Sequence, residues 1–400
     1  MTNREIFLLN VAQTSSFPLL LEIEKAEGIY LYDTSNKKYI DLISGISVSN
    51  VGHRHPKVVQ AIKDQLDKYM HLMVYGEYVQ APQTLLAQKL SSLLPKSLSS
   101  IYFVNSGSEA VEGAMKLAKR FTKRSKIISC FDAYHGSTQG ALSIGGNEKL
   151  KMNFRPLLPS TERIRFGQLE DLQFIDNQTA AVFIETVQGE SGVTVASTEY
   201  FLSLRKVCNE TGALLVFDEI QCGFGRTGKF WAFEHYDIIP DILLCAKGMG
   251  GGLPLGAFIS SLEIMSVLKE NPILGHISTF GGNPVCCAAS LATIQVIQEE
   301  ELLLEVENKA NLFLKLLDHP LIIKNRNKGL MMAFEFKDFA TLKKVIDHAI
   351  IQGVITDWFL FCDNSMRIAP PLNISTEQIH KACSIIMSSL NDISLELEKM

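Results

Sequence analysis

Residues 213–221 read ALLVFDEIQ, a run of five apolar residues that ends at the carboxylate of Asp218. A short apolar run that gives way to a polar turn predicts a buried β-strand. A single carboxylate after a strand can simply cap the next helix. Asp218 therefore needs a chemical partner elsewhere in the chain before it marks a site.

Five further runs of the same kind flank this stretch, and most end in a polar or glycine-rich turn: residues 100–104, 126–130, 180–184, 242–245 and 257–260. Residues 108–123 and 198–210, which lie between them, have helical periodicity with charges on one side. Strands that alternate with helices predict an α/β fold, with a mostly parallel sheet flanked by helices. Ligands bind at the carboxyl ends of such strands, so a site is expected at that edge.

The two ends of the chain show a different pattern of strand-like and helical segments. Residues 28–43 predict a β-hairpin, because two strand-like pieces flank a turn-forming stretch. From Asn283 onward, long charged helices such as 291–317 precede short strand-like pieces at 331–336 and 366–368. We predict a large domain and a smaller α+β domain built from both termini, with residues 51–282 in the first and residues 1–50 and 283–400 in the second.

The composition is that of a globular protein, with 46% hydrophobic and 20% charged residues. A formal net charge of -5, without long runs of one sign, gives no electrostatic reason to expect nucleic acid or a membrane as partner. The eight cysteines form no C-x-x-C pair and no zinc spacing with histidine, so we expect no metal site and a reducing compartment. No secretory signal or membrane-length apolar stretch is visible, and the sequence predicts a cytoplasmic protein.

The segment CAKGMGGGLPLG, residues 245–256, places Lys247 between an apolar strand and a glycine-rich turn. By itself Lys247 reads as a surface lysine that begins a loop. Burial of its charge would be costly, but a partly desolvated amine is what imine formation needs. A carboxylate against a pyridine nitrogen keeps that nitrogen protonated, so that the ring can accept carbanion charge. Lys247 and Asp218, each at the end of a strand, together predict a pyridine cofactor.

A possible phosphate site lies in YFVNSGSEA, residues 102–110, where a strand leads into a helix. Backbone N–H groups at a helix start bind phosphate, and Ser106 with Glu109 also fits a capping box, so both readings stay open. Tyr134 follows the next strand and could stack on a flat ring, although a core tyrosine is the ordinary alternative.

With these residues in place, the sequence resembles the class III aminotransferases, the fold-type-I group that contains ornithine, acetylornithine and 4-aminobutyrate aminotransferases. The likeness runs in the family's order through residues 52–56 (GHRHP), 105–110 (NSGSEA), 217–234, 246–257, 278–284 (STFGGNP) and 367–372 (RIAPPL). The resemblance implies the PLP-dependent transferase fold type I, pyridoxal 5'-phosphate as cofactor, and a homodimer with active sites at the subunit interface.

The resemblance also implies roles for the matching residues around the cofactor. Lys247 would form the Schiff base, Asp218 would face the pyridine nitrogen, and Gln221 would reach the ring hydroxyl. The other implied cofactor-binding residues are Ser106, Gly107, Ser108, Tyr134, His135, Glu185 and, from the other subunit, Thr279.

Three residues are implied on the substrate side. Arg367 resembles the arginine that grips the α-carboxylate of an amino or oxo acid, a task that suits its planar fork. Glu190 matches a gate that pairs with this arginine when an ω-amino substrate is present and swings away for glutamate. The ordinary alternative for Glu190 is a solvated loop acid. Ser278 is a further predicted substrate-binding residue.

Three positions depart from the family pattern. Thr186 stands where proline is usual. Ser137 stands where ornithine and acetylornithine enzymes usually have an arginine that contacts a substrate carboxylate, and Ile46 stands where ornithine-type enzymes carry tyrosine. The amino donor is therefore left open among diamino acids, acylated diamino acids and other ω-amino acids.

The predicted function is a ping-pong transfer of an amino group to 2-oxoglutarate, with small amino and oxo acids as partners. A decarboxylase or aminomutase of the same fold is the nearest alternative, and a non-catalytic protein that kept the fold is another. A nicotinamide dehydrogenase is disfavoured, because no dinucleotide fingerprint is correctly placed.

Overall fold

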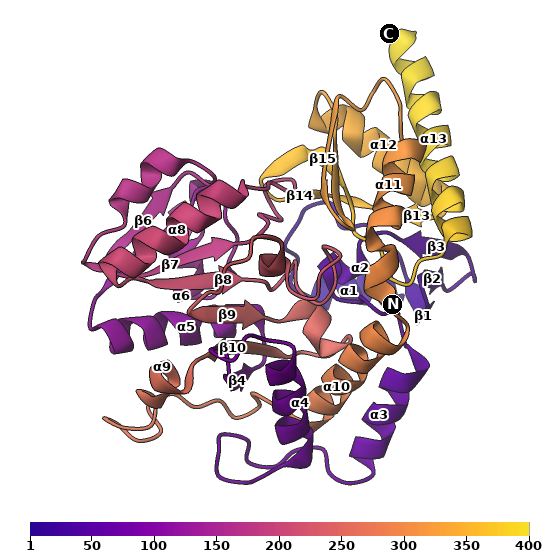
Figure 1. Cartoon of the computed structure of the whole chain (residues 1–400). Helices are drawn as coiled ribbons and strands as arrows, with labels where there is room; N and C mark the ends of the chain where they lie inside the picture. The colour runs from indigo at the N-terminus through magenta and orange to yellow at the C-terminus, as the bar shows by residue number, and fades with distance from the viewer. Residues whose placement is uncertain (400) are drawn as a thin grey trace.

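A seven-stranded sheet lies at the centre of the computed structural model, which describes residues 1–399 (Figure 1). Its strands, in spatial order, are β4 (Ser100–Val104), β10 (Gly256–Ser260), β9 (Ile242–Cys245), β8 (Leu214–Asp218), β7 (Thr179–Glu185), β5 (Lys126–Cys130) and β6 (Thr161–Ile164). Strand β10 is antiparallel to both neighbours, and the other pairs are parallel. The predicted α/β fold is confirmed, together with all six predicted strands.

Strand β6 was not predicted, because it carries little of the apolar signal that marks the central strands. It pairs only with β5 at the edge of the sheet, and its residues TERI include one buried position. An edge strand is partly solvated and does not need a continuous apolar run.

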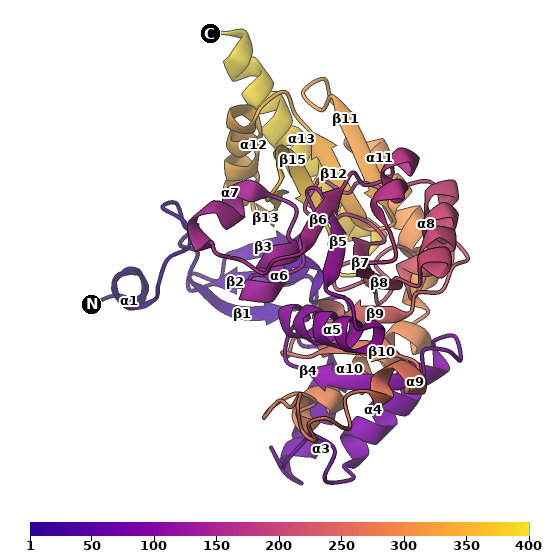
Figure 2. The same cartoon turned by 90° about the vertical axis from the view of Figure 1, so that its left-hand side faces the viewer.

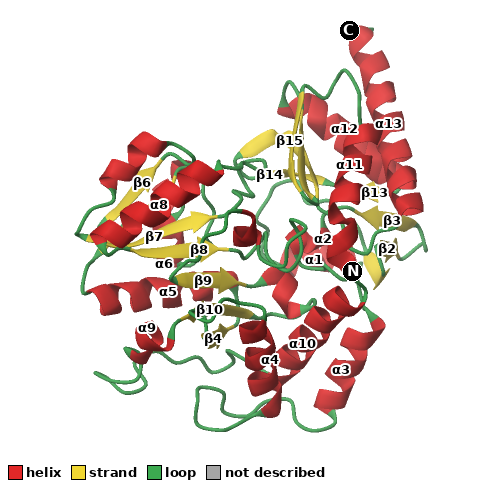
Figure 3. Cartoon of the chain, viewed as in Figure 1, coloured by secondary structure: helices red, strands yellow, loops and turns green. Residues whose placement is uncertain are grey.

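Helices cover both faces of this sheet (Figure 3). Alternate residues of the central strands pack on α5 (Gly107–Thr122), among them Phe183. The intervening residues, among them Phe217, pack on α8 (Thr198–Thr211). Because both faces are covered, β7 and β8 are buried along their whole length.

Two smaller sheets come from the ends of the chain. The first has the order β1 (Ile23–Glu27), β2 (Tyr30–Asp33), β3 (Lys38–Asp41) and β13 (Val354–Ile355), and the second has the order β11 (Lys324–Lys328), β12 (Met331–Glu335), β15 (Cys362–Ile368) and β14 (Asp357–Phe359). The predicted hairpin at 28–43 is confirmed as β2 and β3. Since β3 pairs with β13, the N-terminal segment is tied to the C-terminal part of the chain.

The predicted single helix over 291–317 is wrong. The chain instead forms α10 (Pro284–Glu299), the 3-10 turn η5 (Leu302–Glu305) and α11 (Val306–Leu316). Glu301 breaks the helix with a left-handed φ of 50°. The acidic residues 299–301 follow one another where the negative end of the α10 dipole disfavours further negative charge.

The remaining helices are mostly peripheral. They are α1 (Asn3–Asn10), α2 (Ser44–Ser47), α3 (Pro56–Leu66), α4 (Ala81–Ser92), α6 (Gln139–Ile144), α7 (Glu148–Lys151), α9 (Leu262–Ser266), α12 (Phe339–Gln352) and α13 (Thr376–Glu398), with 3-10 turns η1 (Met152–Phe154), η2 (Leu169–Phe174), η3 (Ala232–His235) and η4 (Lys247–Gly250). Helix α1 buries none of its residues and projects from the body of the protein (Figure 2). Among residues 1–399, no helix has both the length and the apolarity needed to cross a membrane.

Helix α10 packs on α3 and α4 below the large sheet, although the sequence assigns it to the small domain (Figure 1). This packing places α10 against helices of the large domain. The domain boundary near residue 283 stays a prediction.

We predict that Gly113→Ala destabilises the protein, because Gly113 lets α5 lie directly on β10. A Cβ atom at this position would lie 2.3 Å from Cε1 of Phe258. The resulting overpacking is expected to lower the free energy of unfolding by about 1–3 kcal/mol, measured by urea denaturation. Lys116→Ala, on the exposed side of the same helix, should change it by less than about 0.5 kcal/mol. Equal stabilities of the two variants would contradict this close packing.

Candidate active site

A cavity of about 510 Å³ opens at the carboxyl edge of the large sheet. Ten of the residues singled out in the sequence line it: Ser106, Gly107, Ser108, Tyr134, His135, Glu185, Glu190, Asp218, Gln221 and Lys247. The parallel register brings them together, since Glu185 and Asp218 are paired across the ends of β7 and β8. This volume is in the range of sites for small molecules.

Asp218 is held rigidly at the wall of the cavity. Its Oδ1 accepts a hydrogen bond from the backbone N–H of Ile220 at 3.0 Å, and its Oδ2 lies 2.7 Å from Nδ1 of buried His135. The second carboxylate oxygen thus has a partner that fixes its direction. The imidazole Nε2 of His135 is buried and has no hydrogen-bond partner among residues 1–399.

Lys247 follows β9 and has a left-handed backbone, with φ of 47°. Burial lowers the pKa of its amine, and the nearby carboxylate of Glu190 partly opposes this shift. A lowered pKa increases the fraction of neutral amine, which is the nucleophilic form.

The start of α5 points its first turn into the cavity. The hydroxyl of Ser106 accepts from the N–H of Glu109 at 3.2 Å, as expected for an N-cap. The Glu109 carboxylate accepts from the N–H of Asn105 at 2.8 Å instead of that of Ser106, so the capping box is only half formed. The N–H groups of Gly107 and Ser108, in the first turn, have no partner within the helix and can bind an anion.

Glu185 is a second carboxylate beside Asp218. Its two oxygens accept hydrogen bonds from the N–H groups of Tyr134 and Gly189, each at 3.2 Å. Burial, reinforced by the charge of Asp218, raises the pKa of Glu185 well above its usual range. The first of these bonds also positions Tyr134, whose hydroxyl lies 3.1 Å from that of Ser137.

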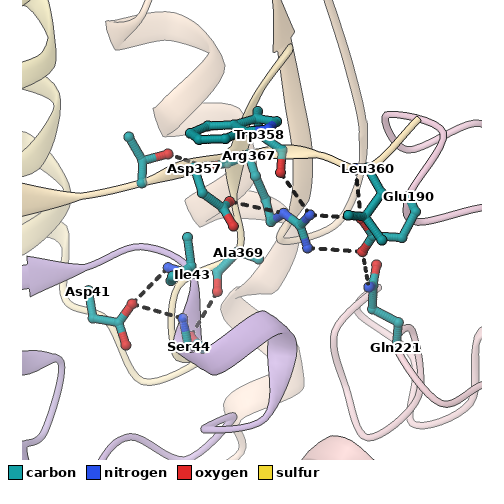
Figure 4. Close-up of polar contacts among 11 residues, drawn as sticks. Asp41, Ile43, Ser44, Glu190, Gln221, Asp357, Trp358, Leu360, Arg367 and Ala369 are labelled. Carbon is teal, nitrogen blue, oxygen red and sulfur yellow. Dashed lines mark hydrogen bonds and ion pairs between the residues drawn. The ribbon is translucent and has the colours of Figure 1, made fainter. Parts of the chain in front are cut away.

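Arg367 and Glu190 form a buried, bidentate ion pair (Figure 4). The two guanidinium N–H groups donate to the two Glu190 oxygens at 3.1 and 2.9 Å, and the amide of Gln221 donates to Oε1 at 2.9 Å. Burial alone would raise the pKa of Glu190, but Arg367 and Lys247 outweigh it and the pKa is lowered. Glu190 is therefore not the solvated loop acid of the alternative reading.

Asp357 is a charged neighbour of Arg367 that was not recognised in the sequence. It lies directly opposite Arg367 in the β14–β15 pair, with Oδ1 3.1 Å from Nε. Phe359 places its ring 4.5 Å from the guanidinium carbon. Recognition of a hairpin over 357–368 would have found this pair, but only residues 366–368 carried a strand signal.

Three predicted residues are not part of the lining of the main cavity: Arg367, which lies behind Glu190, Ser278 and Thr279. Ser278 lines a neighbouring cavity of about 290 Å³, and its hydroxyl accepts from the Asn105 amide at 3.1 Å. Thr279 is exposed on the surface beside it.

This donor set fits pyridoxal phosphate. The α5 N-terminus offers N–H groups for a phosphate dianion, Asp218 offers a carboxylate for a pyridinium nitrogen, and Lys247 offers an amine with a lowered pKa. The fold and the cavity together define a fold-type-I enzyme dependent on pyridoxal phosphate.

The sequence profile of the family Aminotransferase class-III matches residues 11–390. The chain therefore belongs to the class-III aminotransferases. The predicted enzyme class, an aminotransferase with pyridoxal phosphate as cofactor, is confirmed.

Relatives and solved structures agree with this family. The chain is 38% identical to an acetylornithine aminotransferase of Methanopyrus kandleri, over 94% of this chain and 95% of the relative. Its structure is similar to an acetylornithine aminotransferase from Elizabethkingia anophelis, with a TM-score of 0.84, 31% identity, and 97% and 98% of the two chains covered. It is also similar to the ornithine aminotransferase from Toxoplasma gondii, with a TM-score of 0.90, 28% identity, and 98% and 94% covered.

We predict that Gly136→Ala weakens cofactor binding. Gly136 has a φ of 127°, and a Cβ there would lie 2.1 Å from the hydroxyl oxygen of Ser108, so the first turn of α5 must move. We expect an affinity for pyridoxal phosphate about tenfold lower, measured by titration of the apoenzyme. The control is Gly28→Ala, which has a φ of 60° but open space around the new Cβ. It should lower thermal stability and keep the cofactor affinity; parallel losses in both variants would refute the assignment.

Proposed function

We propose that this aminotransferase takes the ω-amino group of an acylated diamino acid and passes it to 2-oxoglutarate in two half-reactions. The observation that carries the proposal is a cavity lined by Lys247, Asp218 and Glu190, in which Glu190 is paired with the buried Arg367 behind it. The donor class follows the names of the relatives, which are acetylornithine aminotransferases.

In this proposal, Gly107 and Ser108 hold the cofactor phosphate and Tyr134 stacks on the ring. Asp218, oriented by His135, keeps the pyridine nitrogen protonated. When bound, pyridoxal phosphate supplies a ring that accepts negative charge from the substrate carbon.

Lys247 has two tasks in the proposed reaction. Its amine would hold the cofactor. When displaced by the amino donor, Nζ would move the proton of the carbon that bears the substrate amine. The lowered pKa of Lys247 suits both tasks, because each requires a neutral amine.

The Arg367–Glu190 pair separates the two substrates. While Glu190 is paired with Arg367, both terminal nitrogens of the guanidinium are occupied. A donor then enters with its ω-amine first and keeps its α-carboxylate away from Arg367. An oxo acid needs the same fork for its own carboxylate, so Glu190 must first leave. Glu190 therefore acts as the proposed gate.

We also propose a homodimer. Thr279 lies in an exposed apolar surface formed by Met70, Leu72, Val79, Ile277 and Phe280. The two segments of this surface are in contact, since the rings of His71 and Phe280 lie 4.9 Å apart. The family resemblance implies that, in a dimer that buries this surface, Thr279 of the partner subunit reaches the cofactor phosphate. The cytoplasmic location remains a prediction.

A screen of amino donors with 2-oxoglutarate tests the proposed reaction. We expect acylated diamino acids to give the highest rate of glutamate formation. Lys247→Ala should stay folded and lower kcat by at least about 10³-fold. Lys309→Ala removes another lysine whose pKa burial lowers, but one outside the cavity, and should keep kcat within about twofold. Full turnover by Lys247→Ala would refute the proposal. So would a screen in which none of the ω-amino donors yields glutamate.

We predict that Ser137→Arg improves the use of N-acetylornithine. Ser137 is exposed at the Tyr134 side of the cavity, where the donor's α-carboxylate would lie. An added arginine should lower the KM about fivefold with little change in kcat, since an exposed ion pair contributes up to about 1 kcal/mol. Ser137→Gln, which adds length without charge, is the control. An equal fall of KM in both variants would place the carboxylate elsewhere.

A further inference from the structure

Arg367 meets two carboxylates, of which only one faces the cavity. Glu190 occupies the two terminal nitrogens from the cavity side, and Asp357 lies beside Nε on the other side (Figure 4). Strand pairing fixes Asp357 in this place, since it is the cross-strand partner of Arg367. Departure of Glu190 would therefore leave Arg367 still paired with Asp357.

The charges in this cluster weaken the attraction of Arg367 for an incoming anion. Arg367 carries one positive charge, while Glu190 and Asp357 can each carry one negative charge. Asp41, on β3, is a further acid near Asp357, and its Oδ2 lies 2.8 Å from Nε2 of His53. A substrate carboxylate at Arg367 is thus repelled by Asp357 even after Glu190 has moved.

We propose that Asp357 is a specificity-determining residue, which offsets the charge of Arg367 and so weakens the binding of any substrate carboxylate at that side chain. This inference rests on the proposed function, because it assigns the Arg367 fork to the carboxylate of the oxo acid. The consequence is a preference for donors that present no carboxylate to Arg367. Such donors can bind while Glu190 stays paired with Arg367.

The effect should depend on pH in a defined direction. Burial raises the pKa of Asp357 to about 6, with Arg367 opposing the shift. The side chain keeps 26% exposure, so solvent protons can reach it. Below pH 6 Asp357 becomes neutral and the pull of Arg367 is restored, whereas above pH 7 the full repulsion is present.

Binding of glutarate, an unreactive dicarboxylate, to the holoenzyme tests this inference by calorimetry. At pH 8.0 we expect Asp357→Asn to bind glutarate roughly tenfold more tightly than the unchanged protein, and at pH 5.5 the difference should shrink to about twofold. Asp363→Asn removes an exposed acid of β15, the strand that carries Arg367, and should bind like the unchanged protein. Asp357→Glu keeps the charge and should keep both the weak binding and its pH dependence.

Equal affinities of the unchanged protein and Asp357→Asn at pH 8.0 would overturn the inference. So would a difference of the same size at both pH values, because this would trace the effect to shape and not to charge. If Asp357→Asn does not fold, the glutarate affinity of Asp357→Glu must still rise as the pH falls, or the inference fails. The binding measurement needs no turnover, so it distinguishes failure of this inference from failure of the proposed reaction.

Discussion

Charge buried at the carboxyl edge of the large sheet is the constraint on which the site depends. Lys247 and Arg367 face the carboxylates of Glu185, Glu190 and Asp218 in and around one cavity. A buried charge is costly unless an opposite charge or a hydrogen bond meets it. The pKa directions follow from this constraint: Lys247 is shifted toward the neutral amine, and Glu190 is kept as a carboxylate by Arg367.

The small sheets matter because they deliver Arg367 to this edge from a distant part of the chain. The residues after β15 contact a strained turn, α2, in which Ile46 has a φ of 63°. Asp41 accepts from the N–H groups of Ile43 and Ser44 at 2.9 Å, and the Ser44 hydroxyl donates to the carbonyl of Ala369 at 2.8 Å (Figure 4). The strand that carries Arg367 is thereby anchored to the N-terminal segment, and the turn is held in a conformation that costs free energy by itself.

The chemistry and the substrate preference arise from different parts of the site. The residues proposed to face the cofactor line the cavity at the carboxyl edge of the large sheet. The residues proposed to select the substrate, Ser137, Glu190 and Asp357, lie on loops or on the small sheet. Loops and edges tolerate exchange more readily than buried strands do, so one cofactor site can serve many substrates.

By itself the sequence determined the α/β class, six of the seven strands of the large sheet, and the position of Lys247 and Asp218 at the ends of two of them, because short apolar runs and the polar residues that end them are local signals. Only the tertiary structure decided that Glu190 forms an ion pair with Arg367, that Asp357 lies opposite Arg367, and that the Glu109 carboxylate accepts a hydrogen bond from the N–H of Asn105. It also decided the break at Glu301. These features depend on strand register, side-chain direction and contacts between distant segments, none of which leaves a periodic pattern in the chain.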